Sequence, residues 1–350
     1  GVAAQTGQDG DEMLAAYVAG VEVGARLASV AKGGFHQVGF HPTGVIGAFA
    51  CALVAGRLLG LSAAQLSMAQ GIALSVASGS LEFLSDGAWT KRMHPGWAAV
   101  AGLTAATLAR HGFKGPSQAY EGRFGVFNSY LGALAKDADM GLATADLGEV
   151  WELSKVTIKP MPACHFTHAC ADAAAILRDR HGLRAADIRS VRALVPGEVV
   201  KTVCEPVATK KRPQNSYDAQ FSIPYTVATA LIKGSFGLAD LDEAALRDQT
   251  VLALAEKVEY EIDPDSPFPK YYSGELIVTL ADGRELRHRE HMNRGAAERP
   301  IVNADVERKF FDNMRLAVLP GRARQVCDLV LAIDARSAAR DLQRGLAGRG

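Results

Sequence analysis

The stretch Pro42–Gly60 reads PTGVIGAFACALVAGRLLG, and its composition guides the prediction for the whole chain. Proline suits the first turn of a helix because it has no N–H to donate, and Gly60 suits the position after the last turn. Arg57 is the only charged residue between them. Small, uncharged side chains on every face are typical of a helix packed closely inside a helical domain. The stretch therefore predicts a buried helix from Pro42 to about Leu59.

Similar helices are predicted on both sides of this stretch. Asp11–Val30 carries apolar residues close to helical spacing. Ser62-Ala-Ala-Gln65 has the form of a capping box that opens the next helix. Pro95 suits the first position of a helix over Gly96–Arg110, and Gly112 suits the position just past its end. We therefore expect the first part of the chain to be helical.

The pattern changes after about Leu153, where β-prone segments alternate with helical ones. Alternating apolar and polar residues predict strands, and the Asp282-Gly283 pair between two such segments is a strong hairpin signal. The predicted strands are Ile188–Val195, Lys257–Ile262, Glu275–Leu280 and Arg284–Arg289.

The expected fold is mainly α with an α+β insertion. We expect a large helical domain over residues 1–153, a smaller α+β lid domain over 154–303, and helices over 304–350 that return to the helical domain. The chain of 350 residues is long enough for this division.

Charge and apolar content exclude several classes of protein. Lys plus Arg and Asp plus Glu are balanced at 38 each, so no global field favours nucleic acid or an anionic membrane. The longest apolar run, Gly44–Gly56, is shorter than the roughly 20 residues that span a bilayer. The first residues lack the pattern of a secretory signal, and the five cysteines are scattered, so we expect a soluble cytoplasmic protein with reduced thiols.

Two segments in the helical part carry candidate site residues. His36 and His41 precede the predicted helix start at Pro42, where free N–H groups favour an anion. The alternative is a polar cap with two incidental histidines. Lys91, Arg92 and His94 are predicted on a loop that ends at Pro95. That loop fits a solvated basic turn and an anion-binding cleft equally well, since a desolvated lysine is a good carboxylate partner.

Two further segments lie in the second half of the chain. Lys159–Cys170 contains Cys164, His165 and His168, but their spacing matches no standard zinc site, which argues against a metal. Its prolines indicate an extended junction at the domain boundary, where ligand clefts are common. Tyr217–Tyr225 enters a helix, and ordinary aromatic packing is the favoured interpretation there.

From the residues alone we infer a two-domain protein with a cationic, histidine-containing interdomain cleft for a small, multiply anionic molecule. Four segments taken together resemble the MmgE/PrpD family in order and spacing. They are GFHPTGVIGAFACALVAGRLLGLSAAQ, DGAWTKRMHPGWAAVAGL, KPMPACHFTHACADAA and DAQFSIPYTVATAL. The resemblance covers essentially the whole chain and implies the same architecture.

The resemblance also implies an active site between the helical domain and the lid that uses no metal and no organic cofactor. It assigns catalytic positions to His41, Lys91, Lys159 and Tyr225, and substrate-binding positions to His36, His94, Cys164 and His168. The lysines would bind carboxylates and stabilise negative charge, His41 would bind or transfer a proton, and Tyr225 would donate a hydrogen bond or a proton. Members of the family differ at the positions of His36 and Cys164.

The activity implied by the resemblance is that of a lyase of the dehydratase (hydro-lyase) type on a di- or tricarboxylic acid such as 2-methylcitrate, as in propionate catabolism. An epimerase, isomerase or decarboxylase of the same family is the alternative, and a non-catalytic carboxylate-binding homologue is another. A homodimer is expected. Family members carry roughly a hundred residues before the position of Gly1, so the resemblance implies that an N-terminal segment of the family, which contributes to the active site, is lacking from this chain.

Overall fold

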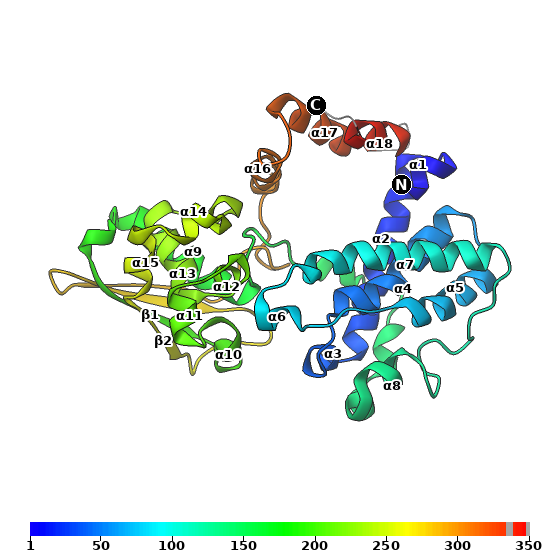
Figure 1. Cartoon of the computed structure of the whole chain (residues 1–350), viewed down its shortest axis with the longest axis horizontal. Coiled ribbons are helices and arrows are strands. Elements are labelled where there is room, and N and C mark those ends of the chain that lie inside the picture. The colour runs from blue at the N-terminus through cyan, green and yellow to red at the C-terminus, as the bar shows by residue number, and fades with distance from the viewer. Residues whose placement is uncertain (334–338, 348–350) are drawn as a thin grey trace. The chain divides into compact units, whose positions relative to one another are not determined.

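The computed structural model describes residues 1–333 and 339–347 (Figure 1). The chain divides into two compact units: unit 1 comprises Gly1–Lys155 and Val318–Gly350, and unit 2 comprises Val156–Ala317. Each unit is described by itself. Of the helices expected over residues 304–350, α16 (Asn303–Met314) belongs to unit 2, and the return to unit 1 begins at Val318. The parts of that expectation at residues 334–338 and 348–350 lie outside the described residues.

The regular secondary structure in the described residues of unit 1 consists of helices joined by turns and loops. Its α-helices are α1 (Val2–Thr6), α2 (Gly10–Val30), α3 (Gly34–Gln37), α4 (Pro42–Leu58), α5 (Ala63–Val76), α6 (Phe83–Asp86), α7 (Thr90–Arg110), α8 (Val126–Leu131), α17 (Pro320–Leu331) and α18 (Ala339–Ala347). Its short 3₁₀ helices are η1 (Gly132–Asp137), η2 (Met140–Ala143) and η3 (Glu152–Lys155). Figure 1 shows α4 alongside α2, α5 and α7, and α18 beside α1.

The α4–α7 pair forms the centre of unit 1 because both helices carry small residues where they meet. A Cβ atom on Gly102 of α7 would lie 2.5 Å from the Ala52 nitrogen and the Cys51 Cβ of α4, so only glycine permits this approach. Val45, Phe49 and Ala52 of α4 are completely buried. The prediction from the Pro42–Gly60 stretch is therefore confirmed, as is the Ser62–Gln65 capping box.

Helix α2 has the length and composition of a membrane span, with a mean hydropathy of 1.4 over its 18-residue window. Gly44–Gly56, the longest apolar run of the sequence, lies within α4 instead. However, α2 packs on α4 and buries the ion pair Glu22–Arg26, both side chains being 4% exposed. Core helices of soluble proteins pass the same hydropathy test, so α2 is compatible with a soluble protein.

Unit 2 contains a four-stranded mixed sheet and the helices that cover it. The strands are β1 (Ile188–Val195), β2 (Val258–Ile262), β3 (Gly274–Leu280) and β4 (Glu285–Glu290). The helices are α9 (His165–His181), α10 (Val200–Val203), α11 (Val207–Lys211), α12 (Ser216–Gln220), α13 (Ile223–Lys233), α14 (Glu243–Leu246), α15 (Gln249–Ala255) and α16, with 3₁₀ helices η4 (Ala185–Asp187), η5 (Gly197–Val199) and η6 (Leu238–Leu241).

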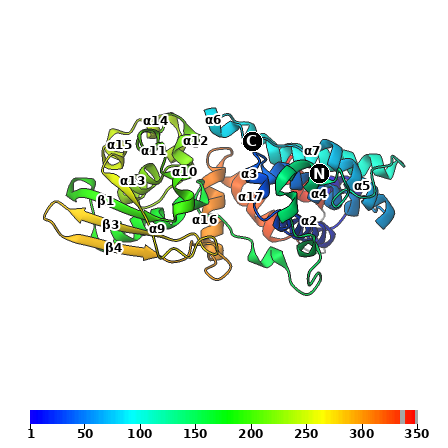
Figure 2. The ribbon, with the colours of Figure 1, turned by 90° about the horizontal axis from the view of Figure 1, so that it is seen from below.

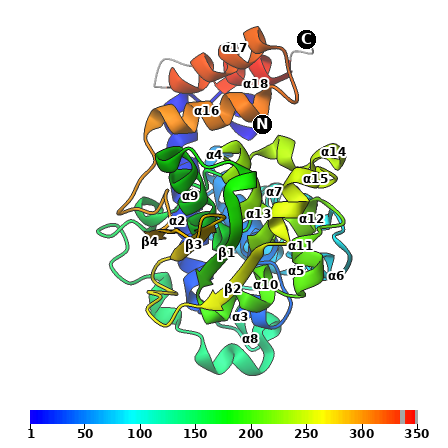
Figure 3. The same cartoon turned by 90° about the vertical axis from the view of Figure 1, so that its left-hand side faces the viewer.

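The strand order is β2-β1-β3-β4, with β1 and β2 parallel and the other neighbours antiparallel (Figures 2 and 3). The β3–β4 hairpin turns at the predicted Asp282-Gly283 pair, where Gly283 has a φ of 90°. All residues of β3 are buried, and α9 packs on β3 and β4. The expected fold class, mainly α with a smaller α+β part, is confirmed.

Candidate active site

His41 stands at the N-terminus of α4 because a short backbone bridge holds the preceding segment. The His41 N–H donates to the Gly79 carbonyl at 2.8 Å, and the Leu81 N–H donates to the Gly39 carbonyl at 2.9 Å. Pro42 then begins the helix with His41 as its N-cap residue. The FHPT sequence therefore places a histidine at a fixed position beside the 78–81 segment.

Lys91 and His94 lie on the first turns of α7 and not on a loop, which corrects the sequence analysis. Helix α7 begins at Thr90 and contains Pro95 in its interior, so proline does not mark its start. The cost is one helical hydrogen bond, since proline has no N–H to donate. Residues three apart lie on one face of a helix, so Lys91 and His94 share a face, whereas Arg92 stacks on Trp89 with its guanidinium carbon 5.1 Å from that ring.

His41 and His94 meet through their ring nitrogens. The two Nδ1 atoms lie 2.9 Å apart. The Phe83 ring lies 6.0 Å from each imidazole between ring centres, and the Lys91 Nζ lies 5.7 Å from the centre of the same ring. The structure thus brings His41 of one predicted segment together with Lys91 and His94 of the other.

The pKa values of this cluster favour neutral histidines. Burial, then the charges of His94, Lys91 and His36, lowers the pKa of His41 to about 4. Burial lowers the pKa of His94, and loss of surrounding water together with Lys91 lowers the pKa of His36. Only one proton fits between two Nδ1 atoms in contact, so the neutral rings take opposite tautomers. One Nε2 is then a proton acceptor and the other carries a proton, which is an acid–base pair.

We predict that Gly44→Ala disturbs this pair. A Cβ on Gly44 would lie 2.3 Å from the Ser78 carbonyl oxygen, which is backbone and cannot swing aside. We expect unit 1 to lose about 1–3 kcal/mol of unfolding free energy and the His41–His94 contact to lengthen. Urea unfolding followed by tryptophan fluorescence measures the loss, since Trp89, Trp97 and Trp151 all lie in unit 1. Gly96→Ala is the control, because nothing lies within 4 Å of its Cβ position; equal stability of the two variants would contradict the prediction.

A second cluster lies at the start of α9 in unit 2. The Lys159 Nζ lies 3.5 Å from the Ala163 carbonyl oxygen, and the His168 Nε2 lies 3.4 Å from the same oxygen. The His165 ring lies 4.9 Å from the His168 ring and 4.6 Å from the Tyr272 ring, between centres. The Lys309 Nζ of α16 donates to the Lys159 carbonyl at 2.5 Å. Two lysines and two histidines therefore gather around the KPMPACHFTH segment.

These histidines are also neutral at pH 7. Burial, with Lys159, lowers the pKa of His165 to about 4. Burial, with His165 and Lys159, lowers the pKa of His168 to about 3. Among the described residues, the His168 Nδ1 is a buried polar atom without a hydrogen-bond partner. Such an atom is costly to bury and marks a place where a donor from a ligand or water would be accommodated.

The low pKa of His168 predicts a pH-dependent stability. Its folded pKa of about 3 lies below the unfolded value of 6.5, so the unfolded chain binds more protons between these values and stability falls as pH falls through that window. From pH 7.5 to pH 5, this residue alone should remove about 2 kcal/mol of unfolding free energy. Urea titrations of the wild type and His168→Gln at both pH values measure it. The same acid sensitivity in both proteins would contradict the prediction.

Two predicted site residues have other surroundings. Tyr225 is 1% exposed in the core of unit 2, where its hydroxyl donates to the Asp240 carbonyl at 2.9 Å and burial raises its pKa. The structure thus places Tyr225 in the core of unit 2, where its hydroxyl is bonded to the Asp240 carbonyl. Cys164 is half-buried at the N-cap of α9, with its N–H donating to the Gln220 carbonyl at 2.7 Å.

Four residues of the second cluster lie outside the site predicted from the sequence: His165, Tyr272, Asn293 and Lys309. His165 had been noticed only as a metal ligand candidate, and among the described residues no group of three or more His, Cys, Asp or Glu side chains is arranged to hold a metal ion. Asn293 lies 3.0 Å from the His165 Nε2 through its Nδ2, across 128 positions of sequence. No local pattern signals a contact of that separation.

Each cluster, taken by itself, combines histidines with lysine, and these residue types are suited to binding an anion and to proton transfer. Family models match the chain: the MmgE/PrpD N-terminal domain matches residues 1–138, and the MmgE/PrpD C-terminal domain matches residues 161–334. The chain belongs to the MmgE/PrpD family.

Three relatives of the chain are named cis-aconitate decarboxylase. The chain is 30% identical over 313 residues to a cis-aconitate decarboxylase of Homo sapiens, covering 87% of this chain and 62% of the relative. It is 29% identical to the Mus musculus enzyme of the same name, with the same coverage. It is 27% identical over 346 residues to a cis-aconitate decarboxylase of Aspergillus terreus, covering 93% and 68%. The chain thus spans 62% of the length of the two mammalian relatives.

Proposed function

We propose that this protein is a lyase that removes CO₂ from an unsaturated tricarboxylic acid of the cis-aconitate type. The names of the relatives support decarboxylation over the dehydration of 2-methylcitrate that the sequence analysis ranked first. The observation that carries the proposal is the 2.9 Å contact between the His41 and His94 Nδ1 atoms, with Lys91 beside it.

This arrangement meets the two needs of the reaction. When the C–C bond to the leaving carboxylate breaks, its electron pair stays on the substrate and spreads into a remaining carboxylate. A lysine ammonium with little surrounding water stabilises that charge strongly. A new C–H bond must then form: the Nε2–H of one ring donates the proton, the Nδ1–H of the other ring moves across the 2.9 Å contact to replace it, and the free Nε2 of that second ring takes a proton from solvent, so that both rings end neutral. His41 and His94 thus serve proton transfer, and Lys91 serves charge stabilisation.

The cluster of unit 2 supplies a second set of carboxylate-binding groups. Lys159 and Lys309 are close enough that the charge of Lys159 lowers the pKa of Lys309, after the effect of burial. An anion that binds near two neighbouring ammonium groups offsets the repulsion between their charges. We therefore propose carboxylate binding by Lys159, with His168 and Cys164 as its neighbours in that cluster.

The test is to supply cis-aconitate, citrate and 2-methylcitrate separately. We expect CO₂ release from cis-aconitate and none from the other two acids. If 2-methylcitrate gives the ultraviolet absorbance of a new alkene and cis-aconitate gives no CO₂, the protein is a dehydratase and the proposed decarboxylation is wrong. Saturable binding of these acids by calorimetry without turnover of any would leave a carboxylate-binding function in place of a lyase.

A further inference from the structure

Asn293 is a buried amide held between two groups of known hydrogen-bonding character. It is 2% exposed. Its Oδ1 accepts the backbone N–H of Tyr272 at 3.1 Å, and its Nδ2 lies 3.0 Å from the His165 Nε2. The two contacts use opposite ends of the amide. Once one end is identified as the oxygen, the other end must be the NH₂ group.

The backbone N–H fixes the orientation of this amide. An N–H group only donates, so the atom of Asn293 that faces Tyr272 must be its oxygen. The NH₂ end then faces His165, and because it only donates, the His165 Nε2 must accept through its lone pair. A neutral imidazole carries one proton, so that proton resides on Nδ1. The pKa of His165, lowered to about 4, makes this neutral form the state at pH 7.

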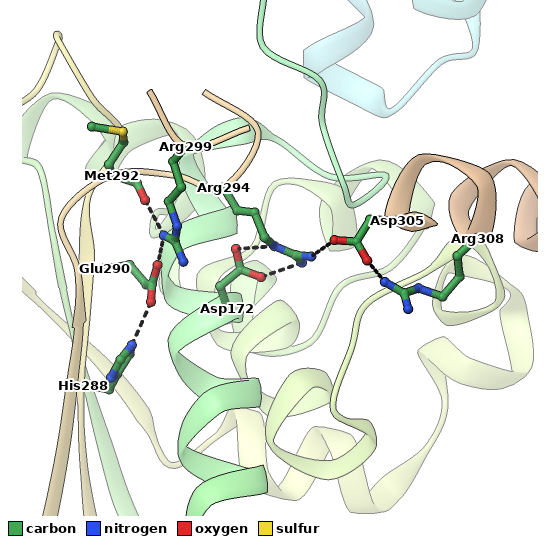
Figure 4. Close-up of polar contacts among 8 residues, drawn as sticks. All are labelled: Asp172, His288, Glu290, Met292, Arg294, Arg299, Asp305 and Arg308. Carbon is green, nitrogen blue, oxygen red and sulfur yellow. Dashed lines mark hydrogen bonds and ion pairs between the residues drawn. The ribbon is translucent and has the colours of Figure 1, made fainter. Parts of the chain in front are cut away.

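The residues on both sides of Asn293, Met292 and Arg294, are held by polar contacts with other segments of unit 2 (Figure 4). On one side, the Arg299 Nη1 donates to the Met292 carbonyl at 2.6 Å and also pairs with Glu290 of β4. Glu290 is 5% exposed and its other oxygen lies 2.7 Å from the His288 Nε2. The residue before Asn293 is thereby tied to the sheet.

On the other side, Arg294 is bound by Asp172 of α9. Its Nη2 lies 2.8 Å and its Nε 3.3 Å from the two carboxylate oxygens, a two-point contact (Figure 4). Such paired guanidinium–carboxylate bonds fix direction as well as distance. Helix α9 also carries His165. The Arg294–Asp172 contact therefore holds the residue next to Asn293 against the same helix that carries the ring which Asn293 contacts.

We propose that Asn293 is a positioning residue that holds His165 as the neutral Nδ1–H tautomer, so that the group which His165 offers to a carboxylate is an N–H donor. Lys159, His168 and Tyr272 also face this ring, and none of them is recorded with a hydrogen bond to its nitrogens among the described residues. The inference rests on the proposed carboxylate-binding function of the second cluster, since it names the role of one more residue there.

The test reads the tautomer directly by NMR of protein with ¹⁵N-labelled histidine, without substrate. His165→Gln assigns the signals. In the wild type at pH 7 we expect Nδ1 to be protonated and Nε2 to be unprotonated. In Asn293→Asp the carboxylate accepts instead of donating, so the proton should move to Nε2 and the pKa of His165 should rise by at least one unit. Asn313→Asp, an exposed asparagine of α16 in the same unit, is the matched control and should leave both unchanged.

Two results would overturn the inference: an Nε2–H tautomer in the wild type, or the same tautomer in Asn293→Asp as in the wild type. The wild-type measurement needs only His165→Gln, for the assignment, so it still decides the question if Asn293→Asp is unstable. Citrate binding by calorimetry is the separate readout of the proposed function. We expect Asn293→Asp to bind citrate about tenfold more weakly; absence of citrate binding in the wild type would defeat carboxylate binding while the NMR result still decides the role of Asn293.

Discussion

Replacing Lys91 with methionine should reduce kcat/KM for CO₂ release by about 10²- to 10³-fold, the range seen when one group that stabilises developing charge is removed. Methionine keeps the length and apolar stem of lysine and removes only the ammonium. The Lys91 Nζ lies 5.7 Å from the centre of the Phe83 ring and the residue is only half-buried, so the melting temperature should stay within a few degrees of the wild type. The expected pattern is therefore a loss of activity without a loss of fold.

The same substitution has a spectroscopic consequence that a folding defect would not produce. The charge of Lys91 contributes to the low pKa of both His41 and His36. Its removal should raise both pKa values, which ¹⁵N histidine NMR measures against pH. Lys114→Met is the control, because Lys114 is exposed in unit 1. Unchanged turnover in Lys91→Met would exclude this lysine from the reaction, and unchanged histidine pKa values would show that its charge does not reach the pair.

Local patterns in the sequence predicted those parts of the fold that local chemistry decides. The capping box at Ser62, the strand Ile188–Val195 and the Asp282-Gly283 hairpin are found as predicted, since each depends on neighbours within a few residues. The start of α7 was predicted wrongly because Pro95 is a frequent first residue of helices, whereas here the helix gives up one hydrogen bond and begins at Thr90.

Local patterns also predict only part of the candidate site. His41, Lys91 and His94 carry recognisable motifs, and the structure brings them together. Tyr225 carries a motif as well, yet its hydroxyl is used within the core by Asp240. Asn293 has no motif at all, because its contact with His165 depends on the hairpin and the Arg294–Asp172 pair that return the chain to α9. Residue types select candidates, but only tertiary contacts show which polar atoms remain for a ligand.

The buried pair Glu22–Arg26 is the feature of unit 1 whose loss should cost most stability. The Arg26 Nε lies 2.6 Å from the Glu22 Oε1, and its Nη1 and Nη2 donate to the carbonyls of Ala145 and Val150 at 2.6 Å each. Burial alone raises the pKa of Glu22, but the Leu153 N–H and Arg26 outweigh it, so the pKa lies below its usual value and the carboxylate is charged. The pair thus connects α2 to residues 145–153 of the same unit.

We expect Arg26→Met to lower the unfolding free energy of unit 1 by about 3–5 kcal/mol, because it leaves the buried Glu22 carboxylate without its opposite charge and removes the donor to the Ala145 and Val150 carbonyls. Glu22→Gln combined with Arg26→Met should cost less than Arg26→Met alone, since the unpaired charge is gone. Arg57→Met is the control: it removes the exposed partner of Glu12 in the same unit and should cost at most about 1 kcal/mol. Urea unfolding followed through Trp151, which adjoins Val150, measures all three. A loss in Arg26→Met no larger than in Arg57→Met would mean that water reaches Glu22 and that the segment after α8 is held by its apolar contacts alone.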